Sequence, residues 1–446
     1  MEKKKYYKEM MTIGLPITLQ AIFQASYSLV DQIMVGTLGT VNIAGSGLGA
    51  KFSSLVTFTI SAIASVASIL IAQYHGSQDE EGVNKSFFSC LVIGFLVMTL
   101  FAIPSVLIPQ EIMGIYSTDL KTIQAAGSYL RIIGISFIPM TGTLIISSLF
   151  RSIEKSKYPM QASIISMFLN IGINYILIFG KFGMPKLGLA GAAFGTLISR
   201  TVELFVVIYW LLNLKIRQGF YLHCLLPRDT KFYRKIGIII LPILLNEFSW
   251  SIGENIYAAI YGRMGTDALA AITLTNPLQG MFIGMFAGVS TAAVVMVGKR
   301  LGKNDLEEAY QISKFLIKFG VVASIIIGVV LFCISGWYIE LFRVEPEVKQ
   351  LADHIIYALA IVIIVKVSNM ILAGGVLRSG GNTKITLLID LIGTWVFGVP
   401  LGLLSAFVWK MPIYMVYLIL SQEELIRLII GFYFFRKKGW MKNITK

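Results

Sequence analysis

The chain has 446 residues, of which 56% are hydrophobic and only 14% are charged, and its mean hydropathy is +0.76. Soluble proteins carry roughly 25% charged residues, so this composition excludes an ordinary soluble domain and favours a membrane protein. The net charge of +14 would suit a nucleic-acid partner. The distribution of that charge along the chain, described below, excludes this interpretation.

About twelve hydrophobic stretches are long enough to span a bilayer, which takes about 20 mostly apolar residues. The predicted membrane-spanning helices lie at residues 11–35, 48–74, 87–110, 123–149, 159–180, 187–213, 236–262, 273–298, 311–340, 351–377, 384–409 and 412–435. We therefore expect an all-α integral membrane protein with no additional soluble domain.

The second half of the chain repeats the first half at an offset of 226 to 227 residues. The internal alignment pairs Pro16 with Pro242, Gly36 with Gly262, Asp79 with Asp305, Arg151 with Arg378 and Arg200 with Arg427. Two similar bundles in one chain are typical of transporters whose halves rock against each other around a central site. We expect two six-helix lobes, at residues 1–218 and 236–446, joined by a cytoplasmic linker at 219–235.

Lysine and arginine are concentrated in every second connection between the predicted spans, at residues 3–5, 151–157, 215–235, 299–303 and 436–438. The intervening connections carry few of them. This asymmetry follows the positive-inside rule, by which Lys- and Arg-rich connections stay in the cytoplasm. It predicts a multi-pass protein of the cell membrane with both termini in the cytoplasm, in contact with the lipid bilayer and not with nucleic acid.

The usual motifs of catalysis are absent from the sequence. There is no GxxxxGK[ST] phosphate loop, no HExxH zinc motif and no GxSxG nucleophile elbow, and the three cysteines show no metal-binding spacing. We therefore expect a transporter and not an enzyme, without a cofactor. Transport would be driven by an ion gradient, by a partner or by the gradient of the substrate itself.

Polar residues inside the predicted spans are candidate binding groups, because a charge at the bilayer centre costs roughly 2.5–3.5 kcal/mol. One helical face of the first span carries four of them: Gln20, Gln24, Tyr27 and Asp31. The fifth span carries a similar face: Ser163, Ser166, Asn170 and Asn174. Asp31 with the amide oxygens of Asn170 and Asn174 could hold Na⁺, or Asp31 could bind H⁺. Alternatively, these groups satisfy one another through hydrogen bonds between helices.

The seventh predicted span carries two acids, Glu247 and Glu254, near Trp250. Two acids beside an aromatic ring could bind an organic cation through charge and contact with the ring face. Met281 in the eighth span could add an adaptable apolar wall. The alternative is that one acid neutralises a basic group such as Lys366 in the tenth span, or that Glu254 faces lipid headgroups.

The polar positions differ between the two halves. Asp31 aligns with Tyr257, Glu247 with Ala21, Glu254 with Ser28, Asn170 with Phe397 and Asn174 with Leu401. In the sixth span, the spacing of Arg200 and Glu203 predicts an internal ion pair. This divergence suggests ion coupling in the first lobe and substrate contact in the second.

Several of these segments resemble the MATE (multidrug and toxic compound extrusion) transporters, over nearly the whole chain. The segments are residues 30–36 (VDQIMVG) with Leu38, Gly39 and Ala44, residues 170–180, residues 188–193 (GLAGAA) with Thr196, and residues 377–383 (LRSGGNT). The resemblance implies a twelve-helix exporter with two six-helix lobes, V-shaped when open. Such an exporter exchanges Na⁺ or H⁺ for amphipathic, often cationic, compounds.

The resemblance also implies site residues. The first-span aspartate of the family corresponds to Asp31, and the fifth-span polar pair corresponds to Asn170 and Asn174. With these, the predicted cation site contains Gln24, Tyr27 and Thr196. The predicted substrate contacts are Glu247, Trp250, Glu254 and Met281. In the tenth span, where some members carry an acid, this chain has Lys366 and Asn369.

A second hypothesis is a flippase for a lipid-linked oligosaccharide or a related lipid, since relatives of this fold carry out that function. A flippase would favour a cavity rich in Arg and Lys to hold a phosphate group. The best-aligned polar face of this chain is acidic, so we favour an ion-coupled exporter. We expect it to act as a monomer on small organic molecules.

Overall fold

The computed structural model describes residues 2–218, 226, 230–340, 342 and 344–445, with the side chains of residues 2, 3, 25–29, 40 and 214–218 outside that description. The described residues form helices joined by short connections, with no strand among them. They are arranged in two compact units, which we call the N-unit (Leu19–Ile236) and the C-unit (Met1–Thr18 with Gly237–Lys446).

The first helix, α1 (Glu2–Gly36), contributes to both units. Its first part packs within the C-unit, where the Thr18 hydroxyl donates a hydrogen bond of 2.7 Å to the carbonyl of Met285. Gly14 and Gly288 also bring their backbones together there, and a side chain on Gly288 would overlap the Gly14 carbonyl. These contacts place the boundary between the compact units inside α1. The lobe boundaries predicted from the sequence stay a prediction.

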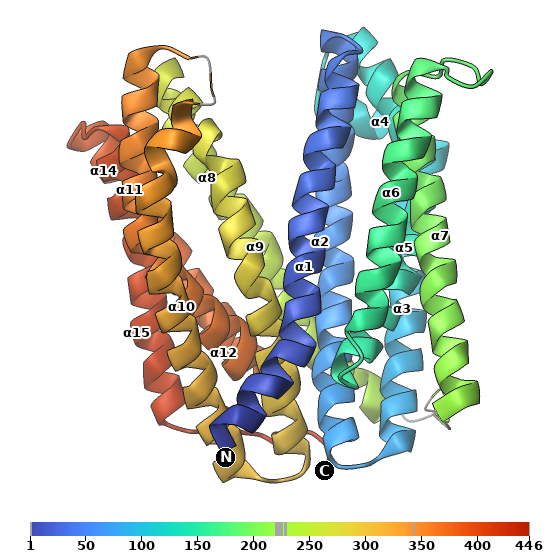
Figure 1. Ribbon diagram of the computed structural model, residues 1–446, viewed down its shortest axis with the longest axis vertical. Coiled ribbons are helices and arrows are strands. Elements are labelled where there is room, and N and C mark those ends of the chain that lie inside the picture. The colour runs from blue at the N-terminus through green and yellow to red at the C-terminus, as the bar shows by residue number, and fades with distance from the viewer. Residues whose placement is uncertain (1, 219–225, 227–229, 341, 343, 446) are drawn as a thin grey trace. The chain divides into compact units, whose positions relative to one another are not determined.

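The N-unit contains the rest of α1 and six further helices, drawn from blue to green in Figure 1. They are α2 (Thr40–Gly76), α3 (Glu80–Leu107), α4 (Pro109–Gly114), α5 (Leu120–Ser152), α6 (Lys157–Phe179) and α7 (Leu189–Gln218). α2, α3 and α5 pack against one another, and α7 packs against both α5 and α6. Both α2 and α5 contribute fully buried aliphatic side chains, such as Ile69 and Leu149.

The C-unit contains most of α8 and the helices that follow it. The elements are α8 (Thr230–Arg263), α9 (Thr266–Gly302), α10 (Leu306–Glu340), α11 (Pro346–Asn369), η1 (Met370–Leu377), α12 (Thr383–Leu391), η2 (Ile392–Gly398), α13 (Val399–Leu403), η3 (Leu404–Val408), α14 (Ile413–Leu420) and α15 (Gln422–Arg436). The three η elements are π-helical segments, which insert an extra residue into a helical turn. The eleventh predicted span is therefore not one regular α-helix.

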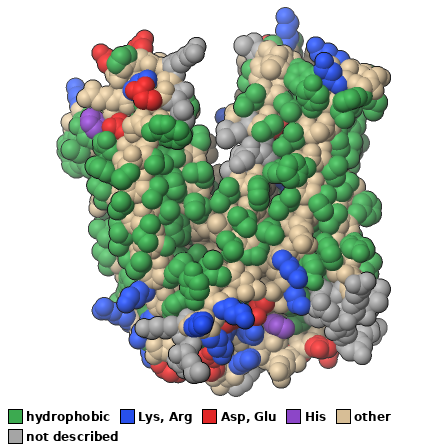
Figure 2. Space-filling model, viewed as in Figure 1, with side chains coloured by type: hydrophobic (Ala, Val, Ile, Leu, Met, Phe, Trp, Pro, Cys, Tyr) green, Lys and Arg blue, Asp and Glu red, His purple; other side chains and the backbone are tan. Residues whose placement is uncertain are grey.

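Ten of the described helices are long and apolar enough to cross a membrane, by length and composition alone. α1 and the consecutive helices α14 and α15 correspond to the two remaining predicted spans, 11–35 and 412–435. Figure 2 shows hydrophobic side chains along the flanks of the helices, with Lys, Arg, Asp and Glu gathered mainly at their ends. The predicted all-α membrane fold is confirmed.

The repeat predicted from the sequence is visible in the connections between helices. Asp79 caps α3 by accepting a hydrogen bond of 2.8 Å from the Gly82 amide, and Asp305 caps α10 in the same way through the Glu308 amide at 3.0 Å. Such caps satisfy amide groups that the first helical turn leaves without partners. The aligned residues Gln78 and Asn304 precede these caps with φ angles of 61° and 63°. The same local turn is thus built twice.

Candidate functional site

Asp31 of α1 lies beside the polar face of α6. Its Oδ1 accepts a hydrogen bond of 2.7 Å from the side-chain amide of Asn174. The same amide nitrogen donates to Asn170 Oδ1 at 2.9 Å. The structure therefore brings together the three residues that the sequence groups into a cation site. The side chain of Tyr27, predicted to join them, lies outside the described residues.

Close packing of α6 and α7 holds Asn174 in place. Gly191 of α7 lies against the backbone of Leu177, and a side chain on Gly195 would overlap Asn174 Oδ1. Small residues four apart allow two membrane helices to approach closely. Asn174 is fully buried, and its Oδ1 has no hydrogen-bond partner. The oxygen of the amide that contacts Asp31 thus lies against Gly195 and has no donor.

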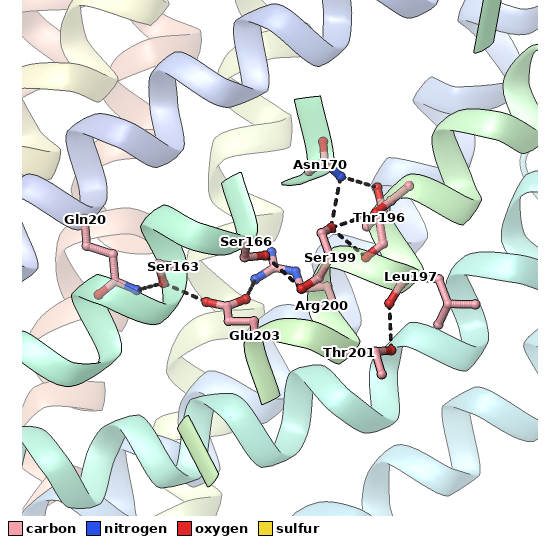
Figure 3. A network of polar contacts seen from close by, with 11 residues as sticks. Gln20, Ser163, Ser166, Asn170, Thr196, Leu197, Ser199, Arg200, Thr201 and Glu203 are labelled. Carbon is pink, nitrogen blue, oxygen red and sulfur yellow. Dashed lines mark hydrogen bonds and ion pairs between the residues drawn. The ribbon is translucent and has the colours of Figure 1, made fainter. Parts of the chain in front are cut away.

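The polar network continues from α6 into α7 (Figure 3). The Asn170 side-chain amide donates to Ser199 Oγ at 3.1 Å and to Thr196 Oγ1 at 3.5 Å. One turn earlier on α6, the Ser166 hydroxyl donates to the Ser199 carbonyl at 3.0 Å. The predicted site residue Thr196 thus joins the network through Asn170.

A second branch of the network ends in an ion pair. Gln20 Nε2 donates to Ser163 Oγ at 2.6 Å, and the Ser163 hydroxyl donates to Glu203 Oε1 at 2.6 Å. Arg200 Nη1 donates to the other carboxylate oxygen of Glu203 at 3.1 Å. The predicted ion pair of α7 is therefore present, and it connects α7 to α1 through Ser163.

The acids of α8 in the C-unit lie near basic groups. Glu247 is 3.8 Å from the Arg378 guanidinium, and Glu254 interacts electrostatically with Lys366. This arrangement corresponds to the alternative in which basic side chains neutralise the acids. Trp250 is 41% exposed, and Met281 packs against the C-unit core. The structure therefore does not gather the four predicted substrate contacts around one pocket that it describes.

A buried charge cluster in α15 is the main feature that the sequence analysis missed. Arg427 lies 3.5 Å from Asp390, 3.4 Å from Glu423 and 3.3 Å from Glu424. Glu424 also accepts a hydrogen bond of 2.8 Å from Asn369. Side chains at Gly393 and Gly398 of η2 would overlap Arg427 and Glu423, so glycine makes room for the cluster. The sequence contained a signal for this cluster, because acids three and four residues before an arginine lie on the same face of a helix as that arginine.

Among the described residues, no group of three or more His, Cys, Asp or Glu side chains is placed to hold a metal ion. In the N-unit, the oxygens near Asp31 come mainly from amide and hydroxyl groups. Such oxygens suit a weakly held monovalent cation or hydrogen bonding with a protonated carboxyl group.

Comparison with known proteins assigns the chain to a family. The sequence profile described as MatE matches residues 16–176 and 242–404, which together exceed half of the chain. This chain belongs to the MatE family. The profile matches each half once, starting at Pro16 and at Pro242, the two prolines that the internal alignment pairs. The duplication inferred from the sequence is thus a duplication of the MatE unit.

Relatives of similar length support the assignment. The chain is 25% identical to a probable multidrug resistance protein NorM of Photorhabdus laumondii, covering 90% of this chain and 87% of the relative. It is 23% identical to a protein of the same name from Thermotoga maritima, covering 98% and 93%. A probable multidrug resistance protein YoeA of Bacillus subtilis is 24% identical, covering 100% and 96%.

Solved structures show the same fold. A MATE crystal structure in complex with MaL6 superposes with a TM-score of 0.89 at 18% identity, covering 97% of this chain and 96% of the other. A MATE transporter of Vibrio cholerae gives a TM-score of 0.90 at 17% identity, covering 98% and 99%. The MatE chain described here is therefore a multi-pass membrane protein of a transporter family.

Proposed function

We propose that this MatE protein is a secondary active exporter of amphipathic, mostly cationic, drugs or metabolites. Export is coupled to inward movement of Na⁺ or H⁺ by alternating access. The protein acts as a monomer in the cell membrane, with both termini in the cytoplasm. The relatives' names, which describe multidrug resistance proteins, support this proposal.

The observation that carries the proposal is the position of Asp31. A carboxylate within a membrane span is retained when it has a function or a partner. Here its partner is an amide that also contacts Asn170, and the oxygen of that amide has no donor. Rotation of the Asn174 amide would turn its oxygen toward Asp31 and create a site for Na⁺. Protonation of Asp31 would instead let the carboxyl group donate to the same oxygen.

Gln24 lies on the same face of α1 as Asp31, and Thr196 of α7 accepts a hydrogen bond from Asn170. We therefore assign both to the coupling site, together with Tyr27. For the substrate we propose contacts with Glu247, Trp250, Glu254 and Met281. The charged side chains of the C-unit favour a cation. Five acids, Glu247, Glu254, Asp390, Glu423 and Glu424, share this region with three bases, Lys366, Arg378 and Arg427. This excess of negative charge attracts a cationic group.

The flippase hypothesis receives less support. A phosphate group would be held by arginine side chains that are available to bind it. Arg200, Arg378 and Arg427 instead each contact a carboxylate of their own unit. We therefore retain the exporter as the proposed function.

The experiment uses purified protein in proteoliposomes loaded with a fluorescent organic cation. A Na⁺ gradient and a pH gradient are imposed separately on wild type, on Asp31→Asn and on Asp267→Asn, which removes an exposed acid at the start of α9. We expect one gradient to move dye through wild type and Asp267→Asn, and neither gradient to move it through Asp31→Asn. Asparagine can still accept the hydrogen bond from Asn174, so this variant should fold. Dye movement through a well-folded Asp31→Asn protein at the wild-type rate would contradict the proposal.

A further inference from the structure

One face of α10 carries two lysines near its start and exposed apolar side chains further along. Lys314 and Lys318 are exposed and lie one helical turn apart. The same face continues through Val322, Ile325 and Val329, which are also exposed, on a helix apolar enough to cross a membrane. Exposed aliphatic side chains on such a helix face lipid tails, and lysines near its end reach toward the headgroups.

The end of α15 carries a row of the same kind. Leu425, Ile429 and Tyr433 are exposed and four residues apart, so they lie on one face of the helix. Lys437 follows at the same spacing and places its ammonium 4.5 Å from the centre of the Tyr433 ring. This second row therefore also passes from apolar side chains to an aromatic ring and a lysine, as side chains do at the interface between lipid tails and headgroups.

An aromatic stack joins the lysine-bearing ends of the two helices, which lie side by side in Figure 1. The ring of Tyr310, on α10, stacks on Phe435 of α15 with a centroid distance of 5.0 Å. Two ammonium groups lie over the Tyr310 ring, that of Lys314 at 4.3 Å and that of Lys438 at 4.5 Å from its centre. One ring thus gathers a lysine from each helix, through the attraction of a cation to a ring face.

The backbone after α15 holds Lys438 in this position. Lys438 has a φ angle of 57°, a conformation that a long side chain rarely adopts. The chain then turns inward to Trp440, which is fully buried and donates from Nε1 to the Phe435 carbonyl at 3.2 Å. The carbonyl of Trp440 lies against Gly380, where a side chain would overlap it. The lysine is therefore part of a packed turn and not of a freely moving tail.

The positive charge at these helix ends is not neutralised by acids of the protein. None of the four lysines described above forms an ion pair with a described residue. The acids at the start of α10 have other partners, because Glu308 lies 3.4 Å from Arg300 and Glu307 accepts a hydrogen bond of 2.7 Å from Gln311. Like charges brought together without a counter-charge favour an anionic ligand.

We propose that the lysines at the start of α10 and the end of α15 bind the phosphate headgroup of an anionic phospholipid. A free phosphate ion has the same charge chemistry, but the two exposed apolar rows that lead away from the lysines suit the acyl chains of a lipid. Basic side chains next to a membrane span attract anionic lipids in this way. Under the topology proposed above, the lipid lies in the cytoplasmic leaflet. The inference does not depend on what the protein transports.

The test measures lipid binding to the purified full-length protein in detergent by native mass spectrometry. The probes are phosphatidylglycerol and phosphatidylcholine with identical acyl chains, and the affinity of the first bound lipid is compared. We expect wild type to prefer phosphatidylglycerol. Lys314→Gln combined with Lys438→Gln should weaken binding of phosphatidylglycerol by about tenfold or more and leave phosphatidylcholine unchanged. Both side chains are exposed, so this double variant should fold.

Two matched pairs of substitutions keep the test decisive. Lys314→Arg with Lys438→Arg retains both charges and their contact with the ring, and should retain the preference for phosphatidylglycerol. Lys303→Gln with Lys384→Gln removes two exposed lysines elsewhere in the C-unit, and should bind as wild type does. An absent preference in wild type, or an equal loss in both glutamine pairs, would overturn the inference. Displacement of phosphatidylglycerol by millimolar inorganic phosphate would also overturn it, because the site would then take a soluble anion.

Discussion

The N-unit and the C-unit use equivalent positions of one scaffold for different polar structures. In the N-unit, Gln20 contacts Ser163, and Arg200 contacts one carboxylate. The aligned residues of the C-unit are Asn246, Asp390 and Arg427. There Asn246 hydrogen-bonds to Asp390, which lies 3.5 Å from Arg427. The same three-helix contact contains one ion pair beside a pocket in the N-unit, and an arginine enclosed by three carboxylates in the C-unit.

The two contacts differ in charge partly because of one side chain on the last helix of each half. Thr196 of α7 aligns with Glu423 of α15, so a hydroxyl in one unit corresponds to a carboxylate in the other. Asp390 also takes the place of Ser163, and Glu424 that of Leu197, so three acids are gained around Arg427, while Glu203 aligns with Ile430. The two units therefore share the packing of their helices. Differences between single aligned side chains determine which unit contains a pocket and which contains a buried charge cluster.

The largest expected effect is a difference in stability between variants of the two aligned arginines, Arg427 and Arg200. Arg427→Gln leaves three buried carboxylates without their shared guanidinium, so we expect a loss of about 3–5 kcal/mol and poor accumulation in the membrane. Arg200→Gln should cost less, since one carboxylate is affected and Ser163 still donates to it. Thermal unfolding of both variants in detergent measures the difference. Equal midpoints would show that the two contacts are energetically alike.

A second expected effect concerns the packing that holds Asn174. Gly195→Ala places a methyl group where Asn174 Oδ1 lies, so it should displace the amide from Asp31. We expect the half-saturating concentration of the coupling ion to rise several-fold in the proteoliposome assay. Gly172→Ala on α6 is the matched control, because a methyl group there meets no atom within 4 Å. An unchanged ion dependence in Gly195→Ala would argue against a coupling role for Asn174.

A third expected effect tests the acids of α8. Glu247→Gln should reduce transport of a cationic dye more than transport of a neutral dye of similar size, because it removes a charge from the proposed substrate region. Arg378→Gln alone and with Glu247→Gln completes a double-mutant cycle for their 3.8 Å contact. A loss of the same size for both dyes, restored in the double variant, would make Glu247 a structural partner of Arg378.

The smallest expected effect tests the scaffold that the units share. Asp79→Ala and Asp305→Ala each remove a helix cap, which costs about 0.5–2 kcal/mol. Because the two caps have the same geometry, we expect similar small decreases in the thermal midpoint and little change in transport. A much larger effect on one side would show that the equivalence of the two units ends at their backbone.

The candidate site was predictable where it followed a helical face. Asp31, Asn170 and Asn174 recur at the spacing of one helix face, and their hydrogen bonds across α1 and α6 agree with that pattern. The pocket at Arg200 and Glu203 was not predictable in the same way. The spacing of these two residues gives an ion pair, but the exposure of Arg200 depends on which side chains of α1 and α6 stand opposite. The cluster at Arg427 is a similar case, because Asp390 and Asn369 come from other elements.

By itself, the sequence determined the membrane class, the twelve spans and the duplicated architecture. These properties follow from hydropathy and periodicity, which act locally along the chain and are repeated in its second half. Only the tertiary structure decided which polar groups meet. Opposing helices select the partners of each buried charge, so Arg427 is enclosed by three carboxylates while the aligned Arg200 borders a pocket. The physical reason is that the energy of a buried charge depends on all its neighbours in space, and most of these neighbours are distant in sequence.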